Sequence, residues 1–550
     1  MKRRDFLAGC GAAGLAGALP GCAPAPPALP PGELARGGLD AGHRVRAGGF
    51  PPPVEEIDVP VLIVGAGIGG LSAAWRLCRN EAEFGAARNP LAILELEDRP
   101  GGNARYGENA ICRYPLGAHY LPLPNQEARA VRALLAELGV LRGAADAPRP
   151  EYDERYLCHA PQERLYRYGL WQEGLLPRLG VPTGELEQQE RFFARMAQFR
   201  DARDASGRRA FALPLAYCGD APEWAALDRL AMRDWMLGEG FDAPSLHWYV
   251  DYACRDDYGT GHDKVSAWAG VHYFACRAGW GGEAGEAVLT APEGNGWLVD
   301  GLQRQIARSP GAVSFHSGQA VYALRQSSGG CEVEAWDRAR GVSLRYRARH
   351  IIWAAPLFLL PHVASALPAD LAKDIAAVSH APWLVANLSL KAPPAPGAGA
   401  ELAWDNVLQD GEGLGYVVAT HQRIRQAPAP TVLTYYRAFP ELAPAAARQL
   451  LLERTREEWA RTVLAELAHA HHDIHDLVTR LDVFRHGHAM ARPLPGFRDR
   501  TRRLEAGWGR VRFAHADVSG LSLFEEANYR GVRAAEDVLA ASGHLRTRLT

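Results

Sequence analysis

The chain has 550 residues, of which 47% are hydrophobic, so it is long enough for two domains and a large buried core. Its formal net charge at pH 7 is −2 and no strongly basic block stands out, which argues against nucleic acid as a partner. The nine cysteines form no Cys-x-x-Cys pair and no metal-ligand spacing, so neither a disulfide-reductase site nor a metal site is expected.

The N-terminus carries an export pattern. Arg3 and Arg4, followed by Phe6-Leu7 and a weakly apolar Gly/Ala-rich run, resemble a twin-arginine signal over residues 1–25. This predicts export of the folded protein to the periplasm by the Tat translocon. The run is too short and too glycine-rich to span a membrane comfortably. Ala23-Pro24-Ala25 resembles a cleavage site, whereas the segment ending at Cys22 loosely resembles a lipoprotein box, so a membrane contact is expected only if Cys22 is lipidated.

Residues 26–56 are rich in Pro, Gly and Ala and include three consecutive prolines at 51–53. This composition is typical of an extended tether with little to bury. We therefore expect the fold to start near Ile57.

A dinucleotide-binding pattern begins there. An apolar run of strand length ends in Gly65-x-Gly67-x-x-Gly70 and leads into an Ala/Leu-rich helix. The glycines allow a tight turn, close approach of the backbone to a pyrophosphate and close helix packing, while the helix start offers free N–H groups to phosphates. A second apolar run ends at Glu95, whose carboxylate can accept hydrogen bonds from both ribose hydroxyls and would repel a 2′-phosphate. The stretch predicts a Rossmann-like unit that does not bind NADP.

The residues after Glu95 distinguish FAD from NAD. Arg99-Pro100-Gly101-Gly102, with Arg105 close behind, resembles a segment of the superfamily of flavin-containing amine oxidases, protoporphyrinogen oxidases and phytoene desaturases. The resemblance implies that FAD is the cofactor, that the paired glycines pass beside its pyrophosphate and that arginines contact the phosphates. Asn103 stands where arginine is more usual, so Arg105 is expected to substitute for it.

Further segments resemble other motifs of this superfamily. Leu116-Gly117-Ala118-His119 is similar to a segment near the flavin ring, which implies that His119 touches flavin or substrate; a histidine that only packs is the alternative. The resemblance also places Val321 against the adenine and Ala354 beneath the dinucleotide. Near the C-terminus, Asp517 matches an acid near the ribityl-pyrophosphate, and the helix after it is expected to aim at the flavin N1–C2=O edge. Phe524 is the aromatic candidate to flank a substrate there, and no cysteine follows Cys331 to link the flavin covalently.

The resemblance covers most of residues 57–540 and implies an α/β fold: a Rossmann-like FAD-binding domain, discontinuous in sequence, with an α+β substrate domain. The expected FAD-binding domain comprises 57–125, 294–358 and 495–545, and the expected substrate domain comprises 126–293 and 359–494. The implied cofactor-binding residues are Gly65, Gly67, Ile68, Gly69, Gly70, Glu95, Leu96, Arg99, Gly101, Gly102, Arg105, Gly117, Ala118, His119, Val321, Ala354, Asp517, Leu523 and Phe524. His119 and Phe524 are the catalytic candidates.

The substrate half matches no family closely. Leu384–Leu390 and Val432–Arg437 are predicted strands, and 444–469 is a predicted amphipathic helix. Many amine oxidases carry on the first of these strands a lysine that holds a water at flavin N5. Here Lys391 lies only at the end of that strand, which weakens a standard amine-oxidase mechanism.

Three functions remain open. No second Gly-x-Gly-x-x-Gly follows a strand, so electrons are expected to pass as hydride from an organic substrate to non-covalent FAD, and then to oxygen or another acceptor. The first hypothesis is an oxidase or dehydrogenase of an amine or polyamine, with Asp256, Asp257 and Glu525 as candidate acids around it. The second is a desaturase or isomerase that acts on a C–C bond of an apolar substrate. The third is a non-enzymatic exported flavoprotein.

Overall fold

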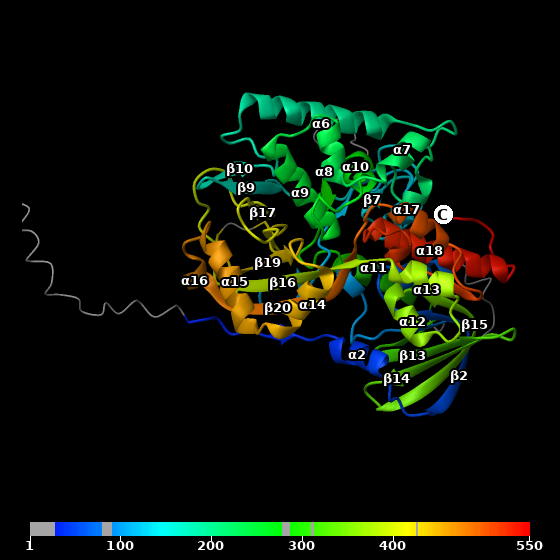
Figure 1. Cartoon of the computed structure of the whole chain (residues 1–550). Coiled ribbons are helices and arrows are strands. Elements are labelled where there is room, and N and C mark those ends of the chain that lie inside the picture. The colour runs from blue at the N-terminus through cyan, green and yellow to red at the C-terminus, as the bar shows by residue number, and fades with distance from the viewer. Residues whose placement is uncertain (1–27, 80–90, 278–286, 310–312, 425–426) are drawn as a thin grey trace, which may run out of the picture.

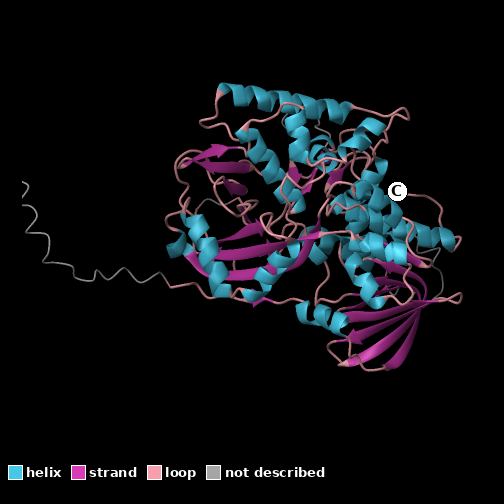
Figure 2. Cartoon of the chain, viewed as in Figure 1, coloured by secondary structure: helices cyan, strands magenta, loops and turns pink. Residues whose placement is uncertain are grey.

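The computed structural model describes residues 28–79, 91–277, 287–309, 313–424 and 427–550, which two main sheets organise (Figures 1 and 2). In the first sheet, β2 (Pro53–Val64) pairs in parallel with β3 (Leu91–Leu94) and with β15 (Val342–Trp353). β12 (Val313–His316) extends the sheet beyond β3, and β21 (Val511–Phe513) pairs with the end of β15. The apolar side chains of the inner strands are buried on both faces, as in other covered parallel sheets.

Helices and a hairpin cover the two faces of this sheet. The first half of β15 pairs antiparallel with β14 (Cys331–Asp337), which pairs in turn with β13 (Gln319–Gln326). The helices on one face are α3 (Ile68–Cys78), α5 (Arg129–Glu137), α11 (Gly296–Ala307) and α18 (Phe524–Ala541). The other face carries the hairpin, α12 (Leu360–Val363) and α13 (Ala369–Ala376). These elements form the Rossmann-like domain that the sequence predicts.

The second sheet belongs to the substrate domain and has the order β1-β20-β16-β19-β18-β17-β9-β10. Its strands are β1 (Leu34–Ala35), β9 (Glu163–Arg167), β10 (Leu170–Glu173), β16 (His380–Leu390), β17 (Asp405–Leu408), β18 (Tyr416–Val418), β19 (Thr431–Ala438) and β20 (Val478–Ala491). β16 and β19 contain the two predicted strands, and every residue in both is buried because both faces of the sheet are covered.

A layer of helices lies above this sheet, at the top of Figure 1. It consists of α6 (Thr183–Asp201), α7 (Pro222–Leu227), α8 (Met232–Gly238), α9 (Pro244–Tyr258) and α10 (Ala267–Ala275). These helices share an apolar core in which Phe192, Phe211 and Trp268 are fully buried. The shorter elements of the chain are β4 (Tyr106–Glu108), β5 (Arg113–Pro115), β6 (Leu121–Pro122), β7 (Leu141–Arg142), β8 (Glu151–Tyr152), β11 (Val288–Leu289), α16 (Ile474–Leu477) and α17 (Phe497–Leu504).

The predicted helix over 444–469 is two helices, α14 (Pro444–Glu453) and α15 (Arg456–Ala468). The break falls at Thr455, where a capping box starts the second helix. The Thr455 hydroxyl accepts the N–H of Glu458, and the Glu458 carboxylate accepts the N–H of Thr455 at 2.8 Å. The side chain therefore satisfies N–H groups that a continuous helix would have paired internally.

The predicted tether is also corrected, because residues 28–52 lie against both domains. β1 joins the substrate sheet, and α2 (Leu39–Ala47) packs beside β13 and α12. The first sheet begins at Pro53 rather than at Ile57, because its first residues pair with the start of β15. Glycine and proline in this stretch allow close packing that the composition alone does not indicate.

Two domain boundaries differ from the prediction as well. α5 and β7 pack through Val131, Leu134 and Leu141 into the core of the Rossmann-like domain, although 126–293 was expected in the substrate domain. α12 and α13 pack under the same sheet through Leu360 and Ile375, although they fall in the predicted 359–494 segment. Both differences arise because the apolar faces of these helices find their nearest partner in the parallel sheet.

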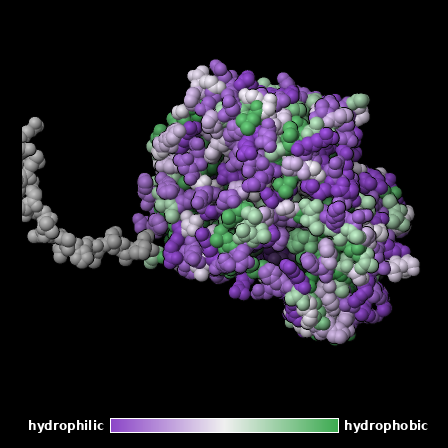
Figure 3. Space-filling model, viewed as in Figure 1, coloured by the Kyte–Doolittle hydropathy of each residue, from purple (hydrophilic) through white to green (hydrophobic). Residues whose placement is uncertain are grey.

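The visible surface is mainly hydrophilic, with small hydrophobic groups among the polar residues (Figure 3). Among the residues that the structure describes, no helix is long and apolar enough to cross a membrane. The export signal, with Arg3, Arg4 and Cys22, lies outside the described residues.

Candidate active site

The turn between β2 and α3 has the geometry of a phosphate-binding loop. Gly65 has a φ of +99°, and a Cβ there would lie 2.8 Å from the backbone nitrogen of Ala355. A Cβ on Gly70 would lie 1.9 Å from the carbonyl oxygen of Gly65. Gly67 caps α3 without a side-chain hydrogen bond, so the first N–H groups of the helix, beginning at Ile68, have no capping acceptor. These groups are available to an anion.

A narrow cradle separates the start of α3 from the turn at Gly101-Gly102. Gly67 and Gly101 are bridge partners, and the N–H of Gly101 donates to the carbonyl of Ala66 at 2.8 Å. A Cβ built on Gly102 would meet only the Cα of Gly67, at 3.3 Å. Any side chain at either glycine would therefore fill this space. The cradle fits the pyrophosphate of a dinucleotide, which needs close approach to bare backbone.

Gly69 lets α3 and α18 approach at their backbones. A Cβ on Gly69 would lie 1.9 Å from the carbonyl oxygen of Ala514, and one on Gly531 would lie 2.1 Å from the carbonyl oxygen of Gly69. Ala514 directly follows β21, so this contact brings the C-terminal motif beside the phosphate-binding loop, as the sequence predicts.

Glu95 follows β3 at the edge of the cradle. Its Oε2 accepts the N–H of Ala66 at 2.6 Å, and its Oε1 accepts the N–H of Glu97 at 2.9 Å. Burial raises the pKa of this carboxyl, although both backbone bonds favour the ionised form. The phosphate-binding loop and the segment that follows β3 therefore hold Glu95 in one place. A carboxylate has about four acceptor positions, which leaves positions for ribose hydroxyls.

The arginines expected at the phosphates are placed differently. Arg105 Nη1 pairs with the Glu97 carboxylate at 3.1 Å, and its Nε donates to the carbonyl of Gly102 at 3.1 Å. Asn103 donates to the carbonyl of Ala489 at 2.6 Å and so ties the cradle to β20. Arg99 is exposed. Phosphate contacts by Arg99 and Arg105 therefore stay predictions.

Ala354 directly follows β15, and Val321 lies in β13 of the same sheet. Ala354 donates its N–H to Val64 and is buried, and Val321 lies at a bulge in β13. Leu96, also predicted to bind the cofactor, follows Glu95 and accepts a hydrogen bond from Arg338 through its carbonyl.

Asp517 is fully buried and already satisfied by protein groups. It accepts the N–H of Leu357 at 2.9 Å and a hydrogen bond from His380 Nε2 at 2.8 Å. Burial alone would raise its pKa, but His515 and His380 beside it hold the pKa well below the usual value. Asp517 thus links the cofactor domain to β16, and its predicted contact with the ribityl-pyrophosphate stays a prediction.

The two catalytic candidates do not meet. Leu523 caps α18, and Phe524 is its first residue, buried in the apolar core of the Rossmann-like domain. The described rings that contact His119 are Tyr120, Trp404 and Tyr436, and Phe524 is not among them. Phe524 therefore does not form an aromatic wall with His119, because the first turn of α18 directs it into the core.

The segment that carries His119 is fixed by backbone contacts. Ala118 donates its N–H to Asn103 at 2.8 Å, and a Cβ on Gly117 would lie 2.4 Å from that same carbonyl oxygen. The Tyr436 hydroxyl donates to the carbonyl of Gly117 at 3.0 Å. The segment therefore joins the cofactor cradle to β19 of the substrate sheet.

His119 stacks on Tyr436, with ring centroids 4.6 Å apart and 25° between the planes, and lies 5.6 Å from Trp404. Tyr120 packs edge-on against Trp404 at 5.9 Å. Burial lowers the pKa of His119 to about 4, so its imidazole is neutral at pH 7. His119 therefore presents a neutral ring to Tyr436 and Trp404, and its contact with flavin or substrate stays a prediction.

Carboxylates adjoin these rings. The Tyr120 hydroxyl donates to Asp256 Oδ2 at 3.5 Å, and Asp256 lies one helical turn after Tyr252 on α9. Asp405 begins β17 and pairs across the sheet with Glu163 of β9. We call His119, Tyr120, Trp404, Tyr436, Asp256 and Asp405 the acidic–aromatic cluster.

Negative charge on Asp256 disfavours ionisation of Asp405, the second acid of this cluster. Burial, followed by repulsion from Asp257, raises the pKa of Asp256 to about 7. Burial, followed by repulsion from Asp256 and Glu163, raises the pKa of Asp405 well above its usual value. Both side chains are half-buried. Both carboxyls are therefore biased towards their protonated forms, and a bound cation would favour their ionised forms.

The other two acids named from the sequence have separate positions. Asp257 pairs with Arg277 at 3.6 Å, although burial still raises its pKa. Glu525 lies in the first turn of α18, where burial raises its pKa to about 7, and Arg277 is the cation that acts on it. Asp256 is thus brought to the rings, whereas Asp257 pairs with Arg277, whose charge also acts on Asp256 and Glu525.

Sequence reasoning missed Tyr120, Trp404, Asp405 and Tyr436. Tyr436 lies in a predicted strand, and this is the one sequence signal that places its ring in the substrate sheet. Asp405 had no signal, because the parallel pairing of β17 with β9 joins residues far apart in the chain. β16 ends at Leu390, before the exposed Lys391. This strand therefore carries no lysine in its interior, where many amine oxidases have one.

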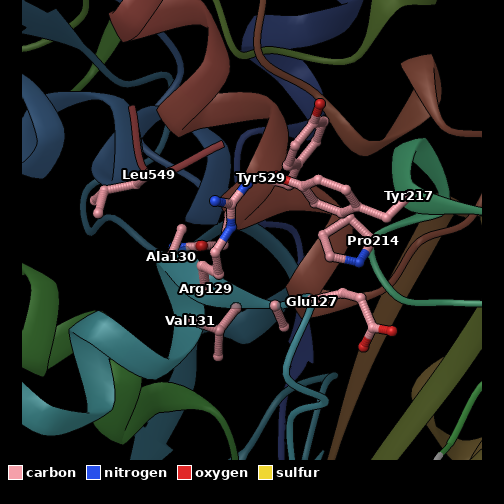
Figure 4. A pocket seen from close by; sticks show the side chains of 10 residues that line it. Glu127, Arg129, Ala130, Val131, Pro214, Tyr217, Tyr529 and Leu549 are labelled. Carbon is pink, nitrogen blue, oxygen red and sulfur yellow. Dashed lines mark hydrogen bonds between the residues drawn. The ribbon is translucent and has the colours of Figure 1, made fainter. Parts of the chain in front are cut away.

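Two surface hollows lie apart from this cluster. The crevice in Figure 4, between the starts of α5 and α18, has no interior volume for a water molecule, and Arg129 spans it to the Tyr217 hydroxyl at 3.0 Å. A hollow of about 290 Å³ is lined by Arg113 and Asp300, which form an ion pair at 3.2 Å. Among the described residues, no group of three or more His, Cys, Asp or Glu is arranged to hold a metal.

The parallel sheet, glycine cradle and Glu95 define a dinucleotide-binding oxidoreductase fold of the flavoprotein type. The sequence pattern of the family "flavin containing amine oxidoreductase" matches residues 68–539, and the chain belongs to this family. It is accordingly an FAD-dependent oxidoreductase, as the glycine and Glu95 motifs predict.

Solved structures show the same fold. A putrescine oxidase bound to putrescine is 17% identical, with a TM-score of 0.61 and coverage of 88% of this chain and 100% of that one. Cyclohexylamine oxidase from Brevibacterium oxydans IH-35A is 18% identical, with a TM-score of 0.61 over 88% and 99% of the two chains. A putative protoporphyrinogen oxidase from Exiguobacterium sp. 255-15 is 14% identical, with a TM-score of 0.56 over 90% and 99%. No curated protein matches the sequence.

Proposed function

We propose that the protein oxidises an organic amine, a class that includes diamines and polyamines, at the acidic–aromatic cluster. The observation that carries the proposal is the placement of two acids with raised pKa values, Asp256 and Asp405, beside four aromatic or imidazole rings. An ammonium group would supply the missing positive charge, and the faces of Trp404 and Tyr436 suit a cation as well as an alkyl chain.

Each residue of the cluster would have a separate role in the reaction. The rings of Tyr436 and Trp404 would orient the carbon chain, and neutral His119 would exclude water from its side of the site. Asp256 would hold the proton that the ammonium group gives up, at Oδ1, since Tyr120 already donates to Oδ2. Bound FAD would supply the hydride acceptor for the carbon next to nitrogen. Oxygen or another acceptor would then take the electrons from the cofactor.

The test is anaerobic mixing of the FAD-loaded protein with monoamines, diamines, polyamines and apolar polyenes, followed by flavin absorbance. We expect bleaching with amines and none with polyenes. Bleaching by polyenes alone would contradict the proposal and support C–C desaturation. Absence of bleaching by every compound would contradict it in favour of a non-enzymatic flavoprotein.

The proposal includes export to the periplasm through the Tat translocon, on the strength of the twin arginines. Replacing Arg3 and Arg4 together with lysine should leave FAD-loaded precursor in the cytoplasm. Unchanged periplasmic protein would contradict this route. Cys22→Ser should leave the soluble fraction unchanged if cleavage follows Ala25, and should release protein from membranes if Cys22 is lipidated.

A further inference from the structure

Residues 28–50, which we call the N-terminal strap, run along the underside of both domains (Figure 1). The strap begins beside β20 of the substrate domain, crosses to the cofactor domain and ends beside the β13–β14 hairpin. It therefore bridges the two halves of the molecule on the side where residues 96–97 leave the cradle.

The first attachment is to β20. Leu481 donates its N–H to Pro31 at 2.9 Å, and Val483 donates to Glu33 at 2.8 Å. Arg480 pairs with Glu33 at 3.0 Å. A Cβ on Gly32 would lie 1.8 Å from the carbonyl oxygen of Leu481, so only glycine permits this close parallel pairing.

The second attachment is to the hairpin of the cofactor domain. The Arg44 guanidinium lies 3.9 Å from the ring centroid of Trp336. Phe50 stacks on Tyr322, with centroids 4.3 Å apart and 10° between the planes. Stacking and cation–π contacts of this kind are favourable, so the strap is held at both ends.

Between these attachments the strap covers the residues that follow Glu95. A Cβ on Gly38 would lie 3.1 Å from Glu97 Oε1 and 3.1 Å from Leu96 Cδ2. Glu97 donates its N–H to the Glu95 carboxylate and pairs through its side chain with Arg105. The strap is therefore one contact away from the group that is expected to bind the adenosine ribose.

We propose that the N-terminal strap is a clasp that retains FAD. Residues 96–97 must move before the adenosine end of the cofactor can leave, and the strap holds them against the cradle. Release then requires local opening of the strap, whose free energy adds to that of breaking the cofactor contacts. By reciprocity, bound FAD must stabilise the closed strap by the same amount. The inference rests on FAD binding and is independent of the amine proposal.

The test uses the full chain loaded with FAD. Gly32→Val should detach β1 from β20 at a point remote from residues 95–97. Gly184→Val is the matched control, since a Cβ on Gly184 meets nothing within 4 Å. After large dilution, release of FAD is followed by the rise in flavin fluorescence. We expect release about tenfold faster in Gly32→Val, equivalent to about 1.4 kcal/mol, and no change in the control.

Reduction of Gly32→Val that still holds FAD should proceed at the wild-type rate, which separates retention from catalysis. If Gly32→Val does not fold, the wild-type protein still gives an answer through hydrogen exchange of the Leu481 and Val483 amides, which the strap protects. FAD should slow their exchange. Wild-type release in folded Gly32→Val, or equal exchange with and without FAD, would overturn the inference.

Discussion

Buried or half-buried carboxylates have different hydrogen-bond partners in the two halves of the molecule. In the cofactor domain, Glu95 accepts two backbone N–H groups and Asp517 accepts one N–H and a histidine. On the substrate side, Asp256 has a single long contact with Tyr120, and Asp405 faces Glu163 and Asp256. Protein donors therefore fix the positions of Glu95 and Asp517, whereas Asp256 and Asp405 retain oxygens that can accept further hydrogen bonds.

This difference indicates which groups compensate the charge of each carboxylate. A buried charge is costly unless donors or a counter-charge compensate it. Glu95 and Asp517 accept hydrogen bonds from the fold itself, which fixes their positions, and Glu95 keeps acceptor positions for ribose hydroxyls. Burial and neighbouring acids raise the pKa values of Asp256 and Asp405, so a bound cation would favour their ionised forms. The contrast fits cofactor binding in the first half and recognition of a cation in the second.

The largest effect is expected from Asp256→Asn. Removing one partner of a buried charge pair costs roughly 2–5 kcal/mol, so kcat/KM for an amine should fall by at least about 30-fold. FAD affinity should be unchanged, because Asp256 lies in the substrate half. The exposed Asp370→Asn is the control, and steady-state kinetics with FAD titration is the measurement. A kcat/KM within about threefold of wild type would break the comparison, since it lies far inside the expected loss.

The second effect concerns cofactor affinity in Glu95→Ala. Charged hydrogen bonds contribute roughly 1.5–3 kcal/mol each when buried, so FAD should bind at least about tenfold more weakly. The variant saturated with FAD should be reduced at nearly the wild-type rate, because Glu95 contacts backbone rather than the acidic–aromatic cluster. Glu190→Ala, on the exposed face of α6, is the control. Wild-type FAD affinity would remove Glu95 from the cofactor site.

The third effect is a pH dependence that belongs to Asp256. Its pKa is raised to about 7, so between its usual range and pH 7 the folded state holds a proton that the unfolded state has lost. Stability contributed by this group is therefore present at low pH and declines as pH rises towards 7. KM for an amine should fall over the same upper range, because the ionised carboxylate binds the cation.

Melting temperature and KM measured from pH 4 to 8 check this prediction in wild type and Asp256→Asn. Glu525 also has a pKa raised to about 7, so the difference between the two proteins isolates Asp256. Burial lowers the pKa values of His119 and His486 to about 4, so these groups also change stability with pH, but equally in both proteins. Identical profiles in both proteins would assign the titration elsewhere.

The smallest effect should come from Thr455→Ala, far from both carboxylate pairs. Loss of the capping box should lower the free energy of unfolding by about 1 kcal/mol, while FAD affinity and amine kinetics stay unchanged. Thr455→Ser should restore the stability. A loss of amine activity in Thr455→Ala would show that the substrate half depends on global stability rather than on its acids.

The sequence predicts the cofactor half better than the substrate half for a physical reason. The turn at Gly65–Gly70 and the acid at Glu95 belong to one local strand–turn–helix–strand unit whose spacing is visible along the chain. Asp256 of α9 and Asp405 of β17 lie far apart in the chain and come within electrostatic range of each other only in the folded protein. The Thr455-x-x-Glu458 capping box was visible in the sequence, yet the predicted helix ran through it.

The tether prediction failed for a related reason. β1 has two residues, which is too short for any hydrophobic alternation, and its partner β20 lies far away in the chain. From composition alone, the glycines of the strap indicate a flexible segment. In the structure, Gly32 and Gly38 instead permit close contact with Leu481 and Glu97. Local pattern predicts elements, but the use of a glycine depends on what packs against it.

The most direct test of the central claim is binding without chemistry. A primary ammonium ion whose nitrogen is attached to a tertiary carbon has no hydrogen on that carbon and cannot donate hydride. The matching tertiary alcohol has the same shape without the charge. Their affinities for the FAD-loaded protein can be measured from the change in flavin absorbance at pH 8. The account predicts that the ammonium ion binds at least about 30-fold more tightly, and that Asp256→Asn abolishes most of this preference. Equal affinity for the ion and the alcohol would contradict the assignment of Asp256 and Asp405 to cation recognition.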